Sequence, residues 1–124
     1  MKKLLVLLFS LLLSFNSHAE WFRVGESTAG YVAYFEIDTV KEHGGYVYYW
    51  VMLDYLIPTE DGAMSASRYL QGECEVGRVK TLSMIFYKQP MGKGESETYN
   101  PPPEWDYPAP GSLLGVTTNY VCNY

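Results

Sequence analysis

The sequence predicts one small domain built around an antiparallel β-sheet. After residue 19, short segments rich in Val, Ile, Phe and Tyr alternate with stretches of Gly, Pro or charged residues. This alternation is typical of strands joined by turns. All 12 tyrosines and all three tryptophans fall in the same part of the chain, as do the only two cysteines, Cys74 and Cys122. We expect the two cysteines to form one disulfide within the sheet domain.

Residues 1–19 have the pattern of a secretory signal peptide. Lys2 and Lys3 precede an apolar run, and small residues lead up to Ala19. The run is about ten residues long, whereas a membrane-spanning helix needs roughly 20. We therefore expect cleavage after Ala19 and export of residues 20–124 to the periplasm, the cell surface or the medium. We expect no transmembrane segment in this mature domain, residues 20–124.

The mature domain is acidic. Without Lys2 and Lys3 it keeps seven basic residues against 14 acidic ones, a net charge near −7. Nucleic acid and anionic lipid are themselves negative, so the sequence argues against both as partners.

Six strands are expected, in the ranges 21–24, 31–38, 46–56, 64–74, 79–87 and 95–99. In the second strand Tyr31, Ala33, Phe35 and Ile37 share one face. Gly44-Gly45 predicts a turn before the third strand, which is apolar on both faces up to Asp54. Such a strand is expected at the centre of the sheet, with both faces covered. The fourth strand is more polar, and we expect it at an edge.

The C-terminal part of the chain is less clear. Five of the seven prolines lie between Pro101 and Pro110, which predicts an ordered connector or an exposed arm. After it, the β-branched residues favour a strand, while Ser112 is a suitable N-cap for a helix. The apolar face of that helix would be Leu113, Val116, Thr117, Tyr120 and Val121. In either case Cys122 must fold back on the fourth strand to reach Cys74.

The mature domain carries no complete set of catalytic, cofactor-binding or metal-binding residues. His43 is its only histidine, too few for a metal site or a His-activated nucleophile. Gly92-Lys93-Gly94 lacks the flanking residues of a phosphate-binding loop. Three carboxylate pairs are candidates for acid–base work, but each is expected to be solvated surface charge: Glu60 with Asp61, Glu73 with Glu75, and Glu104 with Asp106.

Aromatic residues are the main surplus of the mature domain. Tyr, Trp and Phe account for 18 of its 105 residues. Their rings either fill the core or form a surface that binds protein or sugar. The sequence does not identify ligand-binding residues. A two-sided apolar strand also permits a homodimer, so a monomer and a homodimer are both open.

Several features in this order are similar to the surface-adhesin protein E family of small exported bacterial proteins. They are Trp21, Ile37-Asp38, Lys41, Gly44, Val47 to Trp50, Asp54-Tyr55, Cys74, Arg78, Lys80, Gly92-Lys93-Gly94, Trp105, Pro110-Gly111-Ser112 and Cys122. The resemblance spans the whole mature domain. It implies an α+β fold in which an antiparallel sheet of about six strands carries one C-terminal helix on one face. A disulfide, here Cys74–Cys122, would tie the helix down.

The resemblance also implies a function. The expected protein is a non-catalytic module of the bacterial envelope that binds a protein partner, in one version a host extracellular-matrix protein. It needs no cofactor. The alternatives are a periplasmic inhibitor of a basic enzyme such as lysozyme and an envelope protein with a structural role. A carbohydrate-active enzyme that uses a carboxylate pair ranks last.

Overall fold

The computed structural model describes residues 21–123, so the expected signal peptide lies outside the described residues. The strands are β1 (Phe22–Glu26), β2 (Tyr31–Phe35), β3 (Lys41–His43), β4 (Tyr46–Tyr55), β5 (Ser65–Glu73), β6 (Arg78–Gln89), β7 (Lys93–Tyr99) and β8 (Trp105–Asp106). Two short 3₁₀ helices, η1 (Ile37–Thr39) and η2 (Pro90–Gly92), and one α-helix, α2 (Leu113–Cys122), complete the described chain.

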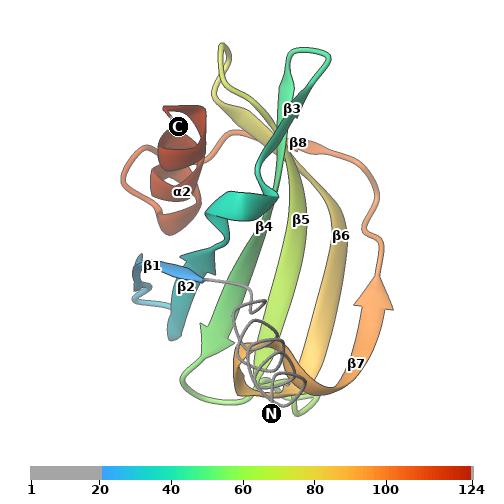
Figure 1. The fold of residues 1–124 in the computed structure, drawn as a ribbon. Helices are drawn as coiled ribbons and strands as arrows, with labels where there is room; N and C mark the ends of the chain where they lie inside the picture. The colour runs from blue at the N-terminus through green and yellow to red at the C-terminus, as the bar shows by residue number, and fades with distance from the viewer. Residues whose placement is uncertain (1–20, 124) are drawn as a thin grey trace, which may run out of the picture.

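All eight strands belong to one antiparallel sheet (Figure 1). Its main path runs β1-β2-β4-β5-β6-β7, while β3 pairs with β4 and β8 pairs with β6. The expected sheet of about six strands is confirmed, and the two short strands extend it. The third predicted strand, now β4, is central as expected, between β2 and β5.

The core lies between this sheet and α2. Phe35, Tyr49, Val51 and Leu70 from three strands pack with Val121 of the helix. We call this side of the sheet the helix face. Tyr31, Ala33 and Phe35 pair with Tyr55, Leu53 and Val51 of β4, so the predicted shared face is confirmed for these three residues. The fourth predicted member, Ile37, lies beyond the end of the strand in η1, where it packs against the same core.

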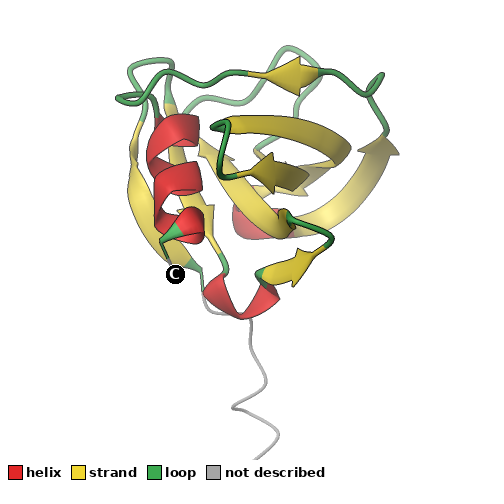
Figure 2. Ribbon diagram, turned by 90° about the horizontal axis from the view of Figure 1, so that it is seen from above, coloured by secondary structure: helices red, strands yellow, loops and turns green. Residues whose placement is uncertain are grey.

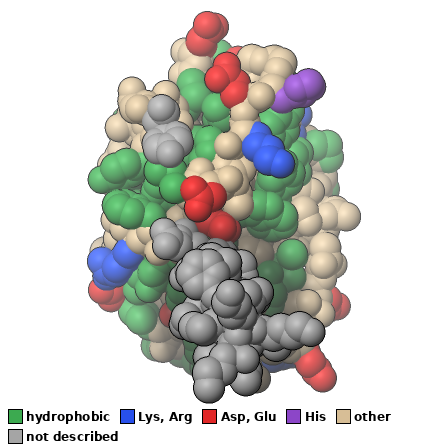
Figure 3. Space-filling view, viewed as in Figure 1, with side chains coloured by type: hydrophobic (Ala, Val, Ile, Leu, Met, Phe, Trp, Pro, Cys, Tyr) green, Lys and Arg blue, Asp and Glu red, His purple; other side chains and the backbone are tan. Residues whose placement is uncertain are grey.

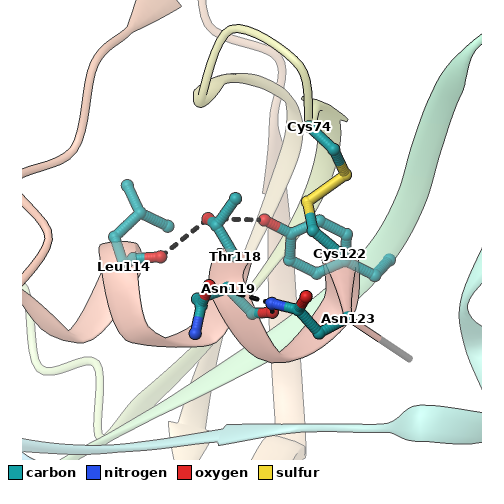
Figure 4. The surroundings of a disulfide bond; sticks show 7 residues. Cys74, Leu114, Thr118, Asn119, Cys122 and Asn123 are labelled. Atoms are coloured by element: carbon teal, nitrogen blue, oxygen red, sulfur yellow. Dashed lines mark hydrogen bonds between the residues drawn. A yellow bond between two sulfur atoms is a disulfide. The ribbon is translucent and has the colours of Figure 1, made fainter.

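A disulfide between Cys74 and Cys122 ties the C-terminal end of α2 to the end of β5 (Figure 4). Their Cα atoms are 5.6 Å apart, although the residues are 48 positions apart in the sequence. The disulfide and the α+β fold with its C-terminal helix are therefore confirmed.

One buried hydrogen bond also joins the helix to the sheet. The Thr118 hydroxyl donates to the carbonyl oxygen of Leu114 at 2.7 Å. Its only proton is used there, so the Tyr49 hydroxyl must donate to Thr118 Oγ1, at 3.1 Å. Burial raises the pKa of Tyr49, and this bond and the Arg68 charge offset part of that effect. The phenol is thus buried with its proton in place and its hydrogen bond made.

The helix alternative for the C-terminal segment is the correct one. Ser112 is the N-cap, and its hydroxyl accepts a hydrogen bond from the Gly115 amide at 3.0 Å. The buried helix residues are Thr117, Thr118 and Val121, while Tyr120 is 49% exposed. The predicted apolar face is therefore rotated, with Thr118 in place of Tyr120. Thr117 and Thr118 can be buried although they are polar, because their hydroxyl groups donate hydrogen bonds to the backbone carbonyls of Leu113 and Leu114.

The N-terminal strands differ from the prediction in three places. The first strand continues to Glu26 through an irregularity between Arg23 and Gly25. The second strand ends at Phe35, because a 3₁₀ turn begins at the next residue. In this turn the backbone carbonyl oxygen of Glu36 accepts hydrogen bonds from the amide and the hydroxyl of Thr39. Lys41–His43 then forms β3, a short strand that the sequence analysis missed. Paired with the start of β4, it makes a hairpin around Gly44-Gly45, both of which have positive φ.

The expectation that the fourth strand lies at an edge is wrong. This strand, β5, pairs along its length with β4 and β6. Its serines are buried, and their hydroxyl groups form hydrogen bonds. Ser65 donates to the Gln89 carbonyl at 2.7 Å, and the Ser67 hydroxyl forms a hydrogen bond with the Tyr87 hydroxyl. The true edges are β1 and β7.

The Pro-rich segment is an ordered connector, one of the two forms predicted. Figure 2 shows it running along one side of the molecule, with β8 midway, before it enters α2. The strand β8 is the anchor, since Trp105 and Asp106 pair with Lys80 and Val79 of β6. The connector carries the chain from the edge strand β7 to the helix.

Candidate binding surface

The side of the sheet opposite α2 carries a row of aromatic side chains. Successive residues of a strand point to opposite sides. Tyr49 and Val51 of β4 face the helix, so Tyr48, Trp50 and Met52 face away from it. The cross-strand registers add residues from neighbouring strands. We call this surface the aromatic face and define it by Tyr34, Tyr46, Tyr48, Trp50, Tyr69, Tyr87 and Trp105.

Five of the seven rings that define the aromatic face lie against one another, in two groups. The Trp50 and Tyr69 ring centroids are 4.9 Å apart, those of Tyr48 and Tyr69 6.2 Å, and those of Tyr46 and Trp105 6.0 Å. All of these residues are half-buried. In Figure 3, hydrophobic side chains gather over the β4–β5 part of the molecule. Stacked rings present apolar area that is already ordered, so binding a partner costs little side-chain entropy.

One end of the row is closed by a cation–aromatic cluster. The Arg78 guanidinium lies 4.0 Å from the centre of the Trp105 ring, and Lys80 Nζ lies 4.3 Å from it. Arg78 also pairs with Glu73 at 3.1 Å, and this hydrogen bond raises the pKa of Arg78. These contacts fix Trp105, which the sequence analysis placed only in a connector or arm. Its role is to hold the connector on the sheet beside Tyr46.

The other end of the row opens into a hollow of about 330 Å³. It lies between Trp50, η1 and η2, and its lining is Trp21, Glu36, Thr39, Trp50, Met52, Ser67, Ile85, Tyr87, Met91 and Gly92. Glu36 is its one carboxylate, and burial, followed by the nearby charge of Asp38, raises the pKa of that group. The hollow therefore offers an apolar wall with a single acidic group.

A strained turn forms the rim of this hollow. Met91 has φ 56° and ψ 39°, the left-handed region that a residue with a side chain rarely adopts. Two hydrogen bonds from backbone amides hold the turn. The Met91 amide donates to Asp54 Oδ1 at 3.0 Å, and the Gly92 amide donates to Ser65 Oγ at 2.9 Å. The sheet thus holds the backbone of this turn at the edge of the aromatic face, where Met91 lines the hollow.

The structure does not assemble the candidate catalytic residues into a site. His43 is exposed at the end of β3. Glu73 pairs with Arg78 instead of Glu75, and Glu75 lies exposed in the β5–β6 turn. The remaining pairs, Glu60 with Asp61 and Glu104 with Asp106, are exposed. Within residues 21–123 no group of three or more His, Cys, Asp or Glu side chains is arranged to hold a metal ion.

The aromatic face could be anticipated only in part. The sequence places aromatic residues on both sides of Tyr46–Leu56, and even spacing along that segment puts Tyr46, Tyr48 and Trp50 together. It does not show that Tyr69 joins them from β5 or that Trp105 returns from the connector. No local pattern marks either contact, because both depend on the pairing of strands.

Together, the fold and this surface define a small disulfide-tied α+β domain with an aromatic face opposite its helix. Residues 21–123 match the sequence profile of the family described as surface-adhesin protein E, so the chain belongs to this family. The resemblance drawn from the residues is confirmed, as is the expectation of an exported protein of the periplasm or cell surface. No helix within residues 21–123 is long and apolar enough to cross a membrane.

Solved structures of protein E from Haemophilus influenzae have the same fold. Crystal form II of that protein is 15% identical to this chain, with a TM-score of 0.61 over 79% of this chain and 91% of the other. Protein E from non-typeable Haemophilus influenzae is 14% identical, with a TM-score of 0.63 over 87% and 78%. At these identities the likeness shows the fold alone. No curated protein matches the chain.

Proposed function

We propose that this protein is a non-catalytic binding module of the bacterial envelope that recognises a protein partner through its aromatic face. One observation carries the proposal. The sheet side opposite α2 is covered only in part, by η1 and η2, and the rest of it bears half-buried aromatic rings that lie against one another. An antiparallel sheet that simply faces water has polar residues there. Aromatic residues are also enriched where proteins bind one another.

The partner we propose is a protein of the host extracellular matrix. Membership of a family described as surface adhesins supports this choice. In this proposal residues 1–19 serve as a signal peptide that is removed, and the exported domain begins at Glu20. It acts on its own or as a homodimer, without a cofactor. Neither the pairs of carboxylates nor His43 has a part in binding.

The test compares one aromatic-face tyrosine with an exposed tyrosine elsewhere. Tyr48 stacks on Tyr69 in the centre of the aromatic face, whereas Tyr120 lies on α2 and is 49% exposed. The exported protein and its Tyr48→Ala and Tyr120→Ala variants are measured against immobilised matrix proteins by biolayer interferometry. We expect Tyr48→Ala to weaken binding at least about tenfold, as loss of a central contact does, and Tyr120→Ala to leave it unchanged.

Two results would contradict the proposal. If both variants bind as the unmodified protein does, the aromatic face is not the binding surface. If the unmodified protein binds no matrix protein but lowers the turnover of lysozyme, the function is that of an enzyme inhibitor. Circular dichroism of each variant confirms that the fold is kept.

A further inference from the structure

The edge strand β7 forms a second surface, which meets the aromatic face at Tyr87. It is the last strand on the main path of the sheet, and it pairs only with β6 among the described residues. All seven of its residues are exposed, and Figure 1 shows nothing of the described chain beside its outer edge. An edge of this kind has unpaired backbone groups that a further strand can meet.

A groove of about 670 Å³ lies over β6 and β7, next to this edge strand. Its walls are the β4–β5 loop on one side and β6 and β7 on the other, and its aromatic lining residues are Phe86, Tyr87 and Tyr99. Tyr99 is 52% exposed. Because Phe86 pairs with Glu97 and Met84 with Tyr99, Phe86, Glu97 and Tyr99 lie on the same face of the sheet. The groove therefore has an apolar floor next to the carboxylate of Glu97.

The charge of the groove selects for a basic occupant. Asp61, Glu95 and Glu97 line it, against one ammonium group from Lys88. Lys88 Nζ donates to the Asp61 carbonyl oxygen at 2.9 Å and leaves the carboxylate of Asp61 unused by that contact. Glu95 and Glu97 are two residues apart, so both side chains point to the same face. A Lys or Arg side chain of a strand beside β7 can place its hydrocarbon part against Tyr99 and its charge beside these carboxylates.

A second copy of this chain is a poor occupant of the same edge. Two copies of β7 related by a twofold axis would pair antiparallel. Registers centred on residue 95, 96 or 97 each place at least one glutamate opposite a glutamate of the other copy. Like charges directly opposite one another destabilise a strand pair. These three registers, which overlap most of β7, therefore disfavour self-association, whereas a segment with the opposite charge meets no such repulsion.

We propose that β7 binds an extended basic segment of a partner protein as an added strand, with Lys or Arg side chains two residues apart beside Glu95 and Glu97. This surface lies on a different strand from the aromatic stack of β4 and β5. The proposal goes beyond the function proposed above and does not depend on it. Strand addition supplies backbone hydrogen bonds, and the alternate side chains supply specificity.

The test uses a short probe peptide, Ser-Lys-Val-Lys-Val-Lys-Ser, labelled with a fluorophore. Fluorescence anisotropy measures its binding to the exported protein and to a variant carrying Glu95→Gln with Glu97→Gln. We expect the double variant to bind at least tenfold more weakly. Glu42→Gln is the matched control, because Glu42 is also an exposed glutamate on a short strand, β3, away from the groove. It should bind as the unmodified protein does.

Two N-methylated forms of the peptide separate strand addition from simple charge attraction. One carries methyl groups on the three lysine amides and the other on the two valine amides, so each blocks one edge of the peptide strand. Strand addition predicts that one form loses binding and the other keeps it. Equal binding of both forms, unchanged binding by the double glutamate variant, or no binding by the unmodified protein would overturn the proposal. Tyr48→Ala should leave peptide binding intact, so failure here is distinct from failure of the aromatic face.

Discussion

The helix face and the aromatic face are made by the same strands, yet they differ in what completes them. On the helix face, Tyr49 is 0% exposed and its hydroxyl is bonded to Thr118. On the aromatic face, the neighbouring residues Tyr48 and Trp50 are half-buried and stack on Tyr69. Adjacent residues of β4 therefore have two different roles. One set stabilises the domain, and the other leaves apolar area available to a partner.

The difference shows that residue type alone does not separate core from binding surface. Tyrosine occurs on both faces of β4, and only the position of α2 distinguishes them. The helix is a weak one, with a glycine and two adjacent threonines in its ten residues. It covers the helix face because the disulfide and the packing of Val121 hold it there. Substitutions that release or loosen the helix should thus affect one face and spare the other.

Removing the disulfide should have the largest effect. In the chain-entropy model, a cross-link between residues 48 positions apart contributes about 4 kcal/mol to stability. We expect Cys74→Ser with Cys122→Ser to lower the free energy of unfolding by about that amount, measured by urea denaturation. Hydrogen exchange should quicken first in the amides of α2. Reduction of the unmodified protein should reproduce the loss, and a loss below about 1 kcal/mol would mean that packing alone holds the helix.

Neighbouring residues of β5 allow the two faces to be compared directly. Leu70 is 0% exposed in the core, so Leu70→Ala should cost about 3 kcal/mol of stability, as large-to-small core substitutions do. Tyr69 is half-buried on the aromatic face, and Tyr69→Ala should cost only about 1 kcal/mol, mainly from lost stacking. Urea denaturation measures both.

Partner binding should show the opposite order. Tyr69→Ala removes the ring on which Tyr48 and Trp50 stack, so it should weaken binding to matrix proteins. Leu70→Ala should leave binding unchanged at temperatures where the variant stays folded. If the two substitutions cost equal stability, or if Leu70→Ala weakens binding more, the two faces are not separate in function.

The sequence predicts the sheet well because its signals are local. Segments dense in β-branched and aromatic residues mark β2, β4 and β6, and Gly44-Gly45 marks a turn that positive φ requires. The disulfide follows from having only two cysteines in an exported chain. The helix is different, since Val116, Thr117 and Val121 suit a strand as well as a helix. Its identity is fixed by tertiary contacts, and the family resemblance was needed to choose it.

The errors fall where distant contacts override local composition. The serines of β5 suggested an edge strand, but hydrogen bonds to Gln89 and Tyr87 make them compatible with the centre of the sheet. The short strand β8 depends on Trp105 meeting Arg78 and Lys80, which lie some 25 residues earlier in the sequence. For the same reason, the sequence predicts that both faces of β4 are covered, which is only partly correct: Tyr46, Tyr48 and Trp50, on the side opposite α2, are half-buried.

A glycine in the helix provides the smallest and most discriminating prediction. By helix propensity, Gly115→Ala should stabilise the protein by about 1 kcal/mol. The structure indicates the reverse, because a Cβ at this position would collide with the backbone carbonyl of Ala109 in the connector. Such overpacking typically costs about 1–3 kcal/mol, so we expect a net loss of about 1 kcal/mol in urea denaturation. Gly111→Ala is the control, since a Cβ there meets no atom within 4 Å and should leave stability unchanged or slightly higher. A more stable Gly115→Ala variant would mean that the connector yields easily and does not help to hold the helix on its face.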